Sequence, residues 1–332
     1  MSTIRLSAVP GRVCLIGEHN DWAGGSAIVV PIDRYVRVQI AQATTLSATA
    51  VLEGKVLSWQ DGEDAGALRL VPAVAQVLSA EWGRPVCGTL HVEGDLPAGR
   101  GFSSSAAVCV ALVRVFATHY GETLTTAEVA ELAYRAEHDV CGIGCGRLDP
   151  LACAWGIPLY LTFTGDDVAA EPLPAHLALA IGSFRAPRDT AQILATLGRH
   201  HRGEVAVRDW EGVVRVGAVR GALSAFDEQA RAARQALYTG DLVSLGASMN
   251  VCQEVYEEEL MPAFPELRAP GLVKAVRALR QAGALGAKFS GAGGDGSVIG
   301  LYAAEDPRIR EGVAALDQLG IDAFAMEVWC SV

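Results

Sequence analysis

The chain of 332 residues is longer than one hydrophobic core of about 250–300 residues, so we expect two domains with a cleft between them. Hydrophobic residues make up 51% of the chain and charged residues 20%, which excludes a disordered protein. The net charge of −11 is spread along the sequence, which argues against nucleic acid or an anionic membrane as a partner.

The first half of the chain alternates β-rich runs with helical stretches. Runs of Val, Ile, Leu and Thr that end at Gly, Pro or Asp predict strands over residues 12–19, 26–32, 35–43, 45–53 and 88–96. Helical periodicity predicts helices over residues 65–83, 103–121 and 125–142. Gly83 and Gly121 stand where helices commonly end, and the serines at 103–105 and Thr125 or Thr126 are suited to N-capping.

In the second half, residues 156–163, 177–184 and 323–330 are predicted as strands. We interpret the acidic connection over residues 164–176 as the domain junction, giving domains at 1–165 and 166–332. Three helical segments follow the junction, and a glycine-rich stretch over residues 283–303 precedes another helix and the last strand. Strands mixed with clustered helices predict an α+β fold.

Neither a membrane helix nor a signal peptide is predicted. No stretch has the ~20 uninterrupted apolar residues that a membrane helix needs, and the N-terminal residues lack the apolar region of a signal peptide. We therefore expect a cytoplasmic protein, and the sequence leaves open whether it is a monomer or homodimer. The eight cysteines lie mostly in apolar runs, and Cys141, Cys145 and Cys153 lack a zinc-binding spacing, so buried free thiols are expected.

The segment "PGRVCLIGEHNDWAGG", residues 10–25, carries a dense polar group directly after a predicted strand. Glu18, His19 and Asp21 are followed by Trp22, and burying such groups is costly without partners. A carboxylate, an imidazole and a ring are the usual groups that bind a polyhydroxylated ligand. The alternative is a surface turn with unconnected charges.

The segment "DLPAGRGFSSSAA", residues 95–107, places a glycine-rich turn before an apolar helix. Gly99 and Gly101 permit tight turning, and the first N–H groups of the helix then point into the loop, which predicts an anion site. The alternative is an ordinary turn with a serine cap. The sequence contains no Walker A, protein-kinase or GxSxG motif, and only three lysines, so backbone amides, arginine and metal would have to hold a phosphate.

The segment "RAEHDVCGIGCGRLDPLACAWG", residues 135–156, contains two candidate acidic groups. Glu137 lies near the end of a predicted helix, and Asp149 follows a glycine-rich loop. Asp149 could accept a proton from a hydroxyl that attacks a phosphoryl group. The alternative is an aspartate that caps the helix beginning at Pro150.

Taken in order, these segments resemble the conserved motifs of the GHMP kinase superfamily, and most closely those of galactokinase-like sugar kinases. Residues 10–25 are similar to PGRVNLIGEHxDYxGG, residues 96–107 to PxGxGLSSSAA with its preceding Leu, residues 136–149 to the AEH…CGxMD segment, and residues 283–296 to the C-terminal glycine motif. The resemblance covers nearly the whole chain. It implies a two-domain fold, with an N-terminal mixed or antiparallel sheet and helices, a C-terminal ferredoxin-like α/β sandwich, and an active site in the interdomain cleft.

The resemblance also implies roles for individual residues. Asp149 corresponds to the catalytic base, and Arg12 to its neighbouring cation. Ser105 and Glu137 correspond to ligands of Mg²⁺. The residues implied in binding ATP are Pro97, Gly99, Arg100, Gly101, Ser103, Ser104, Ser105 and Ala106. The residues implied in binding the acceptor are Glu18, His19, Asp21, Asp149, Gly291 and Gly293, with Ala292 and Gly294 completing the last motif.

The sequence departs from the family pattern at several of these positions. Arg100 and Phe102 replace a small residue and Leu in the nucleotide loop, so we expect the shape of that loop to differ from that in the family. The remaining departures are Leu148 and Pro150 beside Asp149, Trp22 and Ala23 in the first motif, and Asp295 in the last motif.

The resemblance leaves three functions open. The leading hypothesis is phosphorylation of a monosaccharide hydroxyl, the anomeric one being favoured, because Asp21 adds a second carboxylate where mevalonate kinases carry apolar residues. The second is a kinase for mevalonate, homoserine or threonine, whose carboxylate Glu18 and Asp21 would repel unless Arg185 and Arg188 intervene. The third is a galactokinase-like sensor that binds ligands without turnover.

Overall fold

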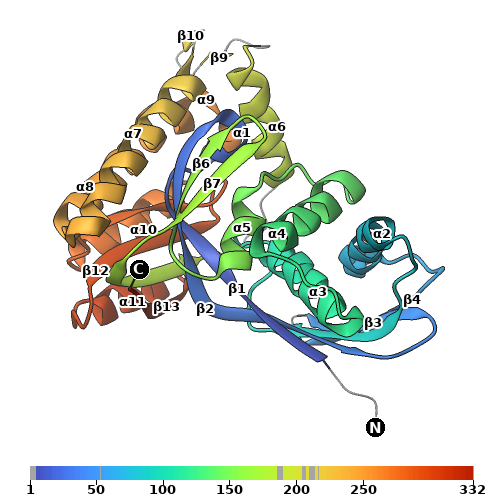
Figure 1. Ribbon diagram of the computed structural model, residues 1–332. Helices are drawn as coiled ribbons and strands as arrows, with labels where there is room; N and C mark the ends of the chain where they lie inside the picture. The colour runs from blue at the N-terminus through green and yellow to red at the C-terminus, as the bar shows by residue number, and fades with distance from the viewer. Residues whose placement is uncertain are drawn as a thin grey trace. The chain divides into compact units, whose positions relative to one another are not determined.

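The computed structural model describes residues 5–52, 54–184, 190–203, 207–208, 214–215 and 217–331 (Figure 1). The chain forms two compact units that are interleaved in sequence. The first contains the residues up to Arg12, 31–98 and 103–156, and the second contains 13–30, 99–102 and the described residues from Ile157 onward. None of the described helices is both long and apolar enough to cross a membrane.

The strands are β1 (Arg5–Ile16), β2 (Gly25–Ala41), β3 (Leu46–Leu52), β4 (Lys55–Gln60), β5 (Gly88–Gly94), β6 (Leu159–Thr164), β7 (Asp167–Pro172), β8 (Ala175–Ser183), β9 (Val207–Arg208), β10 (Val214–Arg215), β11 (Gly286–Ser290), β12 (Ser297–Ala303) and β13 (Asp322–Cys330). The α-helices are α1 (Asn20–Ala23), α2 (Leu70–Trp82), α3 (Ser104–Tyr120), α4 (Thr126–Arg135), α5 (Leu148–Trp155), α6 (Thr190–His201), α7 (Ala218–Thr239), α8 (Leu242–Val255), α9 (Met261–Ala263), α10 (Pro270–Gln281) and α11 (Ile309–Gln318). Shorter turns are η1 (Gly66–Leu68) and η4 (Pro265–Leu267), which are 3₁₀, and η2 (Ala136–Val140) and η3 (Tyr256–Leu260), which are π-helical.

The first unit is built on a mixed sheet. The later part of β2 pairs antiparallel with β5 from Val36↔Gly94 to Ala41↔Thr89, β5 pairs parallel with β3, and β3 pairs antiparallel with β4. The predicted strands at 26–32 and 35–43 are one continuous strand, β2. The predicted strand at 12–19 overlaps only the last residues of β1, which begins at Arg5 and ends at Ile16. β4 was not among the predicted strands, because its residues are exposed and alternate only weakly.

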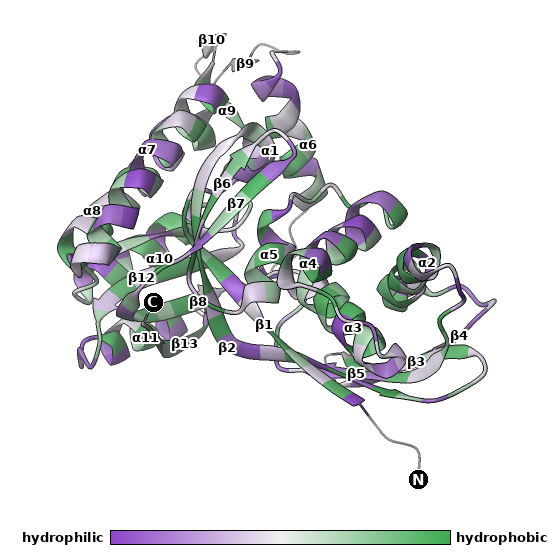
Figure 2. Cartoon of the chain, viewed as in Figure 1, coloured by the Kyte–Doolittle hydropathy of each residue, from purple (hydrophilic) through white to green (hydrophobic). Residues whose placement is uncertain are grey.

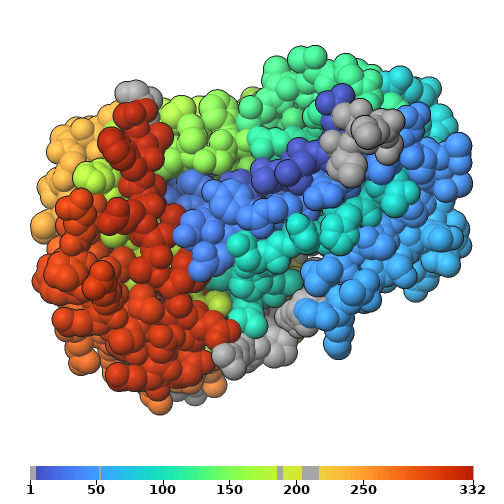
Figure 3. All heavy atoms as spheres, turned by 90° about the horizontal axis from the view of Figure 1, so that it is seen from below, coloured from blue at the N-terminus to red at the C-terminus, as the bar shows by residue number. Residues whose placement is uncertain are grey.

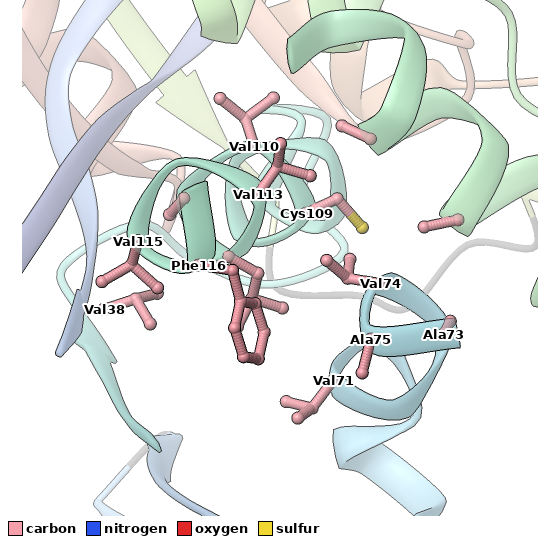
Figure 4. Packing of buried hydrophobic residues seen from close by; sticks show 14 of the residues in the cluster. Val38, Val71, Ala73, Val74, Ala75, Cys109, Val110, Val113, Val115 and Phe116 are labelled. Atoms are coloured by element: carbon pink, nitrogen blue, oxygen red, sulfur yellow. The ribbon is translucent and has the colours of Figure 1, made fainter. Parts of the chain in front are cut away.

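The core of the first unit lies where α2 and α3 meet the sheet. Val38 of β2, Val71 and Val74 of α2, and Val113 and Phe116 of α3 are all buried and lie close together (Figure 4). Packing at this density fixes the start of α3, and with it the serines that follow the glycine-rich turn. The predicted helix stops are confirmed, since α2 ends at Gly83 and α3 at Gly121, both with left-handed φ angles.

The second unit contains an antiparallel four-stranded sheet in the order β11-β12-β8-β13. β8 is buried along almost its whole length because it has a neighbour on each side, whereas β13 is an edge strand with exposed side chains. α10 and α11 pack on this sheet, and α7 is amphipathic, with its apolar residues spaced three or four apart and its hydrophilic side visible in Figure 2.

β6 and β7 form a hairpin in the second unit, and β6 pairs with the first residues of β2. The acidic segment at 164–176, which was predicted to connect two strands, therefore contains a strand of its own, β7. This strand was not predicted because it carries the charged residues Asp167 and Glu171. In the structure Glu171 binds Arg234 at 2.7–3.1 Å, which offsets the cost of placing its carboxylate in the hairpin. The α+β class is confirmed.

Candidate active site

Arg12 and Asp149 form an ion pair in the first unit. β1 positions Arg12, whose side chain is 7% exposed, and Arg12 Nε donates to Asp149 Oδ1 at 2.7 Å. Asp149 lies in the first turn of α5, inside the helix rather than before it, and its side chain is 29% exposed. The helix-capping alternative is therefore excluded, since the carboxylate binds an arginine 137 positions away instead of the N–H groups of its own helix.

Glu137 is the second acidic group of this unit and lies in the π-helical turn η2, which continues α4. Burial raises the pKa of Glu137 to about 7 from its ordinary 4.5, and the charge of Asp149 raises it as well. The hydroxyl of Ser105 donates to Glu137, and this bond and the charge of Arg12 act in the opposite direction. The structure thus brings together four residues singled out by sequence: Arg12, Ser105, Glu137 and Asp149.

Glu137 and Ser105 have the chemistry expected of Mg²⁺ ligands. Glu137 is 3% exposed, and its Oε2 atom has no hydrogen-bond donor among the residues that the structure describes. Mg²⁺ is usually held by one or two carboxylates together with phosphate oxygens and water. Within the described residues no group of three or more His, Cys, Asp or Glu side chains could hold a metal, so an ion here would complete its shell from a nucleotide. The residues present fit that ion.

The glycine-rich loop has the alternating backbone of an anion-binding turn. Positive φ angles occur at Gly99 (69°), Gly101 (85°) and Ser103 (59°), immediately before α3. Successive N–H groups in such a backbone point to one side and attract anions, as do the free N–H groups of a helix start. A non-glycine residue in this conformation is uncommon and is found where a site holds it there.

The sequence prediction that a serine caps α3 was wrong. Ser103 occupies the cap position, but capping requires an extended backbone, and its left-handed φ leaves the hydroxyl without a bond to the helix. Ser103 Oγ is buried and has no hydrogen-bond partner among the described residues. Ser104 and Ser105 are half-buried at the helix start, whereas Ala106 is buried and belongs to the core.

The polar segment after β1 is folded tightly in the second unit. Gly17 has a φ of 95°, and a side chain there would collide with the backbone of Ser26 and Ala27. His19 follows with a φ of 70°, the second non-glycine residue held in the left-handed region beside a predicted site. Asp21 lies in the first turn of α1 and is half-buried.

Glu18 has a partner that the sequence did not reveal. Lys288 on β11 is fully buried and forms an ion pair with Glu18, whose side chain is 2% exposed. The structure therefore assigns the Glu18 carboxylate to a bond inside the protein, and it leaves Asp21 as the more exposed of the two acidic groups. The one feature of the sequence that could have indicated this partner is that Lys288 is one of only three lysines.

Trp22 lies between two histidines. Its ring meets His19 at a centroid distance of 5.7 Å and His201, at the end of α6, at 5.6 Å, both edge-on. Burial and the neighbouring arginines 220 and 202 lower the pKa of His201, so this ring favours its neutral form. The aromatic residue predicted to bind a sugar ring is thus already packed by the protein on two sides.

The last glycine motif packs against Tyr256. Gly291, Gly293 and Gly294 all have positive φ angles, and Tyr256 Oη accepts from the N–H of Gly294 at 2.8 Å. A side chain at Gly293 would collide with the Tyr256 ring. Asp295, a departure from the family pattern, has a structural role, since it accepts from the N–H of Leu272 in the first turn of α10 at 3.2 Å.

Two further predictions concern cysteines and arginines. All eight cysteines are free, as expected, and Cys14, Cys109, Cys153 and Cys252 are buried. Arg185 and Arg188, which were named as possible partners of an acidic substrate, lie outside the described residues.

A mixed sheet with helices, a separate antiparallel sheet, and an anion-binding turn at a helix start define the class of two-domain small-molecule kinases. Three family profiles match the chain: "GHMP kinases N terminal domain" over residues 69–157, "GHMP kinases C terminal" over 233–321, and "Galactokinase galactose-binding signature" over 2–42. The chain belongs to the GHMP kinases, and it is an ATP-dependent small-molecule kinase.

Relatives of two activities resemble the chain. It is 30% identical to galactokinase of Mycobacterium bovis over 90% of this chain and 89% of the relative. It is 27% identical to mevalonate kinase of Thermococcus sibiricus over 89% of this chain and 88% of the relative. The crystal structure of Lactococcus lactis galactokinase complexed with galactose has the same fold, with a TM-score of 0.76 at 20% identity over 98% of this chain and 93% of that one.

Proposed function

We propose that this kinase transfers the γ-phosphoryl group of ATP to a hydroxyl of a monosaccharide, the anomeric hydroxyl being favoured. The observation that carries the proposal is the segment from Gly17 to Trp22, which falls within the galactose-binding signature over residues 2–42. There His19 and Asp21 follow directly after Glu18, whose carboxylate is paired with Lys288, and an imidazole and a carboxylate are groups that bind an uncharged, polyhydroxylated acceptor.

In the proposed mechanism, Asp149 orients the attacking hydroxyl and takes its proton. The ion pair with Arg12 holds the carboxylate in one position, so little rearrangement is needed when the acceptor arrives. Arg12 carries a permanent charge and would also stabilise the negative charge that spreads over the transferred phosphoryl oxygens. Phosphoryl transfer needs mainly positioning and charge stabilisation, and this pair supplies both.

ATP would be bound through the loop from Pro97 to Ala106. The backbone N–H groups around Gly99, Gly101 and Ser103 would donate hydrogen bonds to the phosphate oxygens, which accounts for the absence of a lysine in the loop. Glu137 and Ser105 would hold Mg²⁺, which when bound supplies charge neutralisation of the phosphates. The raised pKa of Glu137 is then a consequence of a buried carboxylate that lacks a cation, and ion binding would favour its ionised form.

A second acceptor class has support from one observation. Lys288 neutralises Glu18, which removes one of the two carboxylates that would repel an acidic acceptor such as mevalonate. A mevalonate kinase is among the relatives, at an identity close to that of the galactokinase. Asp21 still opposes an acid, so the sugar remains the preferred acceptor. Binding of ligands without turnover, the sensor hypothesis, is not favoured, since Arg12 and Asp149 are both present and form an ion pair.

An acceptor screen tests the proposal. The purified protein is incubated with Mg·ATP and, separately, with galactose, other aldoses, mevalonate, homoserine and threonine, and ADP release is followed by a coupled assay. We expect turnover with at least one aldose, and NMR of the product locates the phosphorylated hydroxyl. The Asp149→Asn variant controls for contaminating kinases. Turnover of an acid but of no sugar would overturn the sugar assignment and leave the kinase class intact.

A further inference from the structure

Two residues of the nucleotide loop that depart from the family pattern both contact β13. Arg100 Nη1 lies 2.6 Å from Asp322 Oδ2, and the ring of Phe102 meets the ring of Phe324 edge-on at a centroid distance of 6.2 Å. The loop residues and the strand residues are each two positions apart. The departures are therefore matched by two partners on one strand, and we name these four residues the loop anchor.

The register of β13 explains how it can serve both contacts. Side chains two positions apart on a strand point to the same face, so Asp322 and Phe324 are presented side by side. β13 pairs with β8 through Asp322↔Ser183 and Phe324↔Ile181, and β8 is buried between two neighbours. The loop anchor is thus attached to the edge strand of the four-stranded sheet. Residues near the C-terminus, drawn in red, lie at the surface in Figure 3.

The two contacts of the loop anchor differ in strength. Arg100 and Asp322 are 24% and 39% exposed, and ion pairs at such exposure contribute little to stability. Phe102 is 1% exposed, and burial of an aromatic ring of this size contributes more than an exposed ion pair. The ring therefore fixes the loop on the strand, and the ion pair fixes the direction in which Arg100 points.

The glycines on either side of Arg100 need contacts that hold the loop in one conformation. Gly99 and Gly101, on either side of Arg100, hold left-handed φ angles, and glycine loses more backbone entropy than any other residue when it is fixed. A loop of this composition stays in one conformation only when its side chains are held, and Arg100 and Phe102 are the two large side chains available. The anchor supplies that restraint before the nucleotide arrives.

We infer that Asp322 and Phe324 are positioning residues for the nucleotide, and that Arg100 serves as an anchor of the phosphate-binding loop rather than as a ligand of the phosphates. The inference rests on the proposed binding of ATP at residues 97–106. It does not depend on which acceptor the enzyme uses, because nucleotide binding alone reports on it.

The test compares Asp322→Asn, Arg100→Gln and the double variant. The dissociation constant of the non-hydrolysable analogue AMPPNP with Mg²⁺ is measured by calorimetry without acceptor, and KM for ATP, KM for the acceptor and kcat are measured for each variant. Each single variant is expected to weaken AMPPNP binding and raise KM for ATP by about 2- to 5-fold, with the acceptor KM unchanged. The double variant should be no worse than either single one, because both remove the same contact.

Four further proteins complete the design. Glu327→Gln, which removes a carboxylate from the exposed side of β13, is the matched control and should behave like the unaltered enzyme. Exchanging the charges, with Arg100→Asp and Asp322→Arg together, should restore AMPPNP binding to within about 2-fold, which a phosphate-binding arginine would not allow. Phe324→Leu keeps apolar contact and should fold, with a smaller loss than Phe324→Ala.

Different results would overturn the inference. If Arg100→Gln abolishes AMPPNP binding while Asp322→Asn tightens it, Arg100 is a phosphate ligand that Asp322 restrains. If all variants bind AMPPNP as the unaltered protein does, the contacts have no positioning role. If the unaltered protein binds no AMPPNP, the proposed nucleotide site is wrong and the inference falls with it, whereas turnover of an unexpected acceptor leaves it standing.

Discussion

Lys288 binds Glu18 inside the second unit, although 270 positions separate the two residues in the sequence. The lysine comes from β11 and the glutamate from the turn after β1, so the pair fastens the proposed acceptor-binding segment to the C-terminal sheet. Both side chains are almost completely buried, and each offsets the charge of the other.

Replacing Lys288 by Met should therefore be costly. The variant leaves the Glu18 carboxylate buried without its cation, and we expect the free energy of unfolding to fall by about 3–5 kcal/mol, measured by urea denaturation. Adding Glu18→Gln should recover part of that loss, because the uncompensated charge is then removed. The exposed Lys274→Met is the control and should change stability little. Equal stability of Lys288→Met and the unaltered protein would contradict a structural role for the pair.

The Asp149→Asn variant tests the proposed base. The amide keeps the shape of the carboxylate but neither accepts a proton nor carries charge, so kcat should fall by about 10²- to 10⁴-fold. AMPPNP binding should stay within a few-fold of the unaltered protein, since Asp149 acts on the acceptor. The exposed Asp61→Asn serves as the control for removal of one negative charge. An unchanged kcat in Asp149→Asn would rule out the base assignment.

The raised pKa of Glu137 predicts a pH dependence of stability in the absence of nucleotide. The folded protein holds a proton on this carboxyl up to a pH of about 7, whereas the unfolded chain releases it near 4.5. The stabilisation that this group contributes is therefore fully present below pH 4.5 and is lost as the pH rises through 7. The free energy of unfolding falls by roughly 3 kcal/mol in all.

Thermal unfolding of Glu137→Gln and the unaltered protein from pH 5 to pH 9 measures this effect. The glutamine does not ionise, so the variant should be the more stable protein at pH 8 to 9, and the difference should shrink toward pH 5. Saturating Mg·ATP should reverse the order at pH 8, because the carboxylate then has its cation. A difference in stability that does not vary with pH would show that Glu137 does not titrate in this range.

Ser105→Ala should affect the metal more than the acceptor. Loss of the hydroxyl removes one proposed Mg²⁺ ligand, so the Mg²⁺ concentration for half-maximal rate should rise several-fold while KM for the acceptor stays the same. It also removes the hydrogen bond that Glu137 accepts, which should raise the pKa of Glu137 further and shift the pH profile of Mg·ATP binding upward. The exposed Ser58→Ala is the control, and equal losses for metal and acceptor would argue against ligation by Ser105.

Much of the fold followed from local patterns in the sequence. The glycines at 83 and 121 ended helices as predicted, and Thr125 begins α4 with its hydroxyl and the Glu128 carboxylate bonded to each other's backbone N–H groups. β4 and β7 were missed because their residues are exposed or charged, and a strand on a sheet edge needs no apolar face.

The candidate site was predicted less completely, for a physical reason. Glycines and serines at fixed spacing identified the loop, but partners far apart in sequence decided what each charged group does. The residues alone leave Asp149 as either a base or a cap, and the ion pair with Arg12, a neighbour that the family resemblance implies, excludes the cap. For Glu18 the sequence indicates a ligand-binding role and gives no indication that Lys288 is its partner. Contacts of this kind depend on the tertiary fold, and a single sequence holds no local signal for them.

His19 and Ser103 are both held in a conformation that suits glycine. A selection for thermal stability would therefore favour glycine at either position, because relief of the backbone strain stabilises the folded state by on the order of 1 kcal/mol. The same exchange would delete an imidazole beside Asp21 or a hydroxyl at the start of α3. We therefore expect glycine at either position to raise the thermal stability of this enzyme and to lower its activity. A library screened for thermal stability alone would not detect the loss of activity.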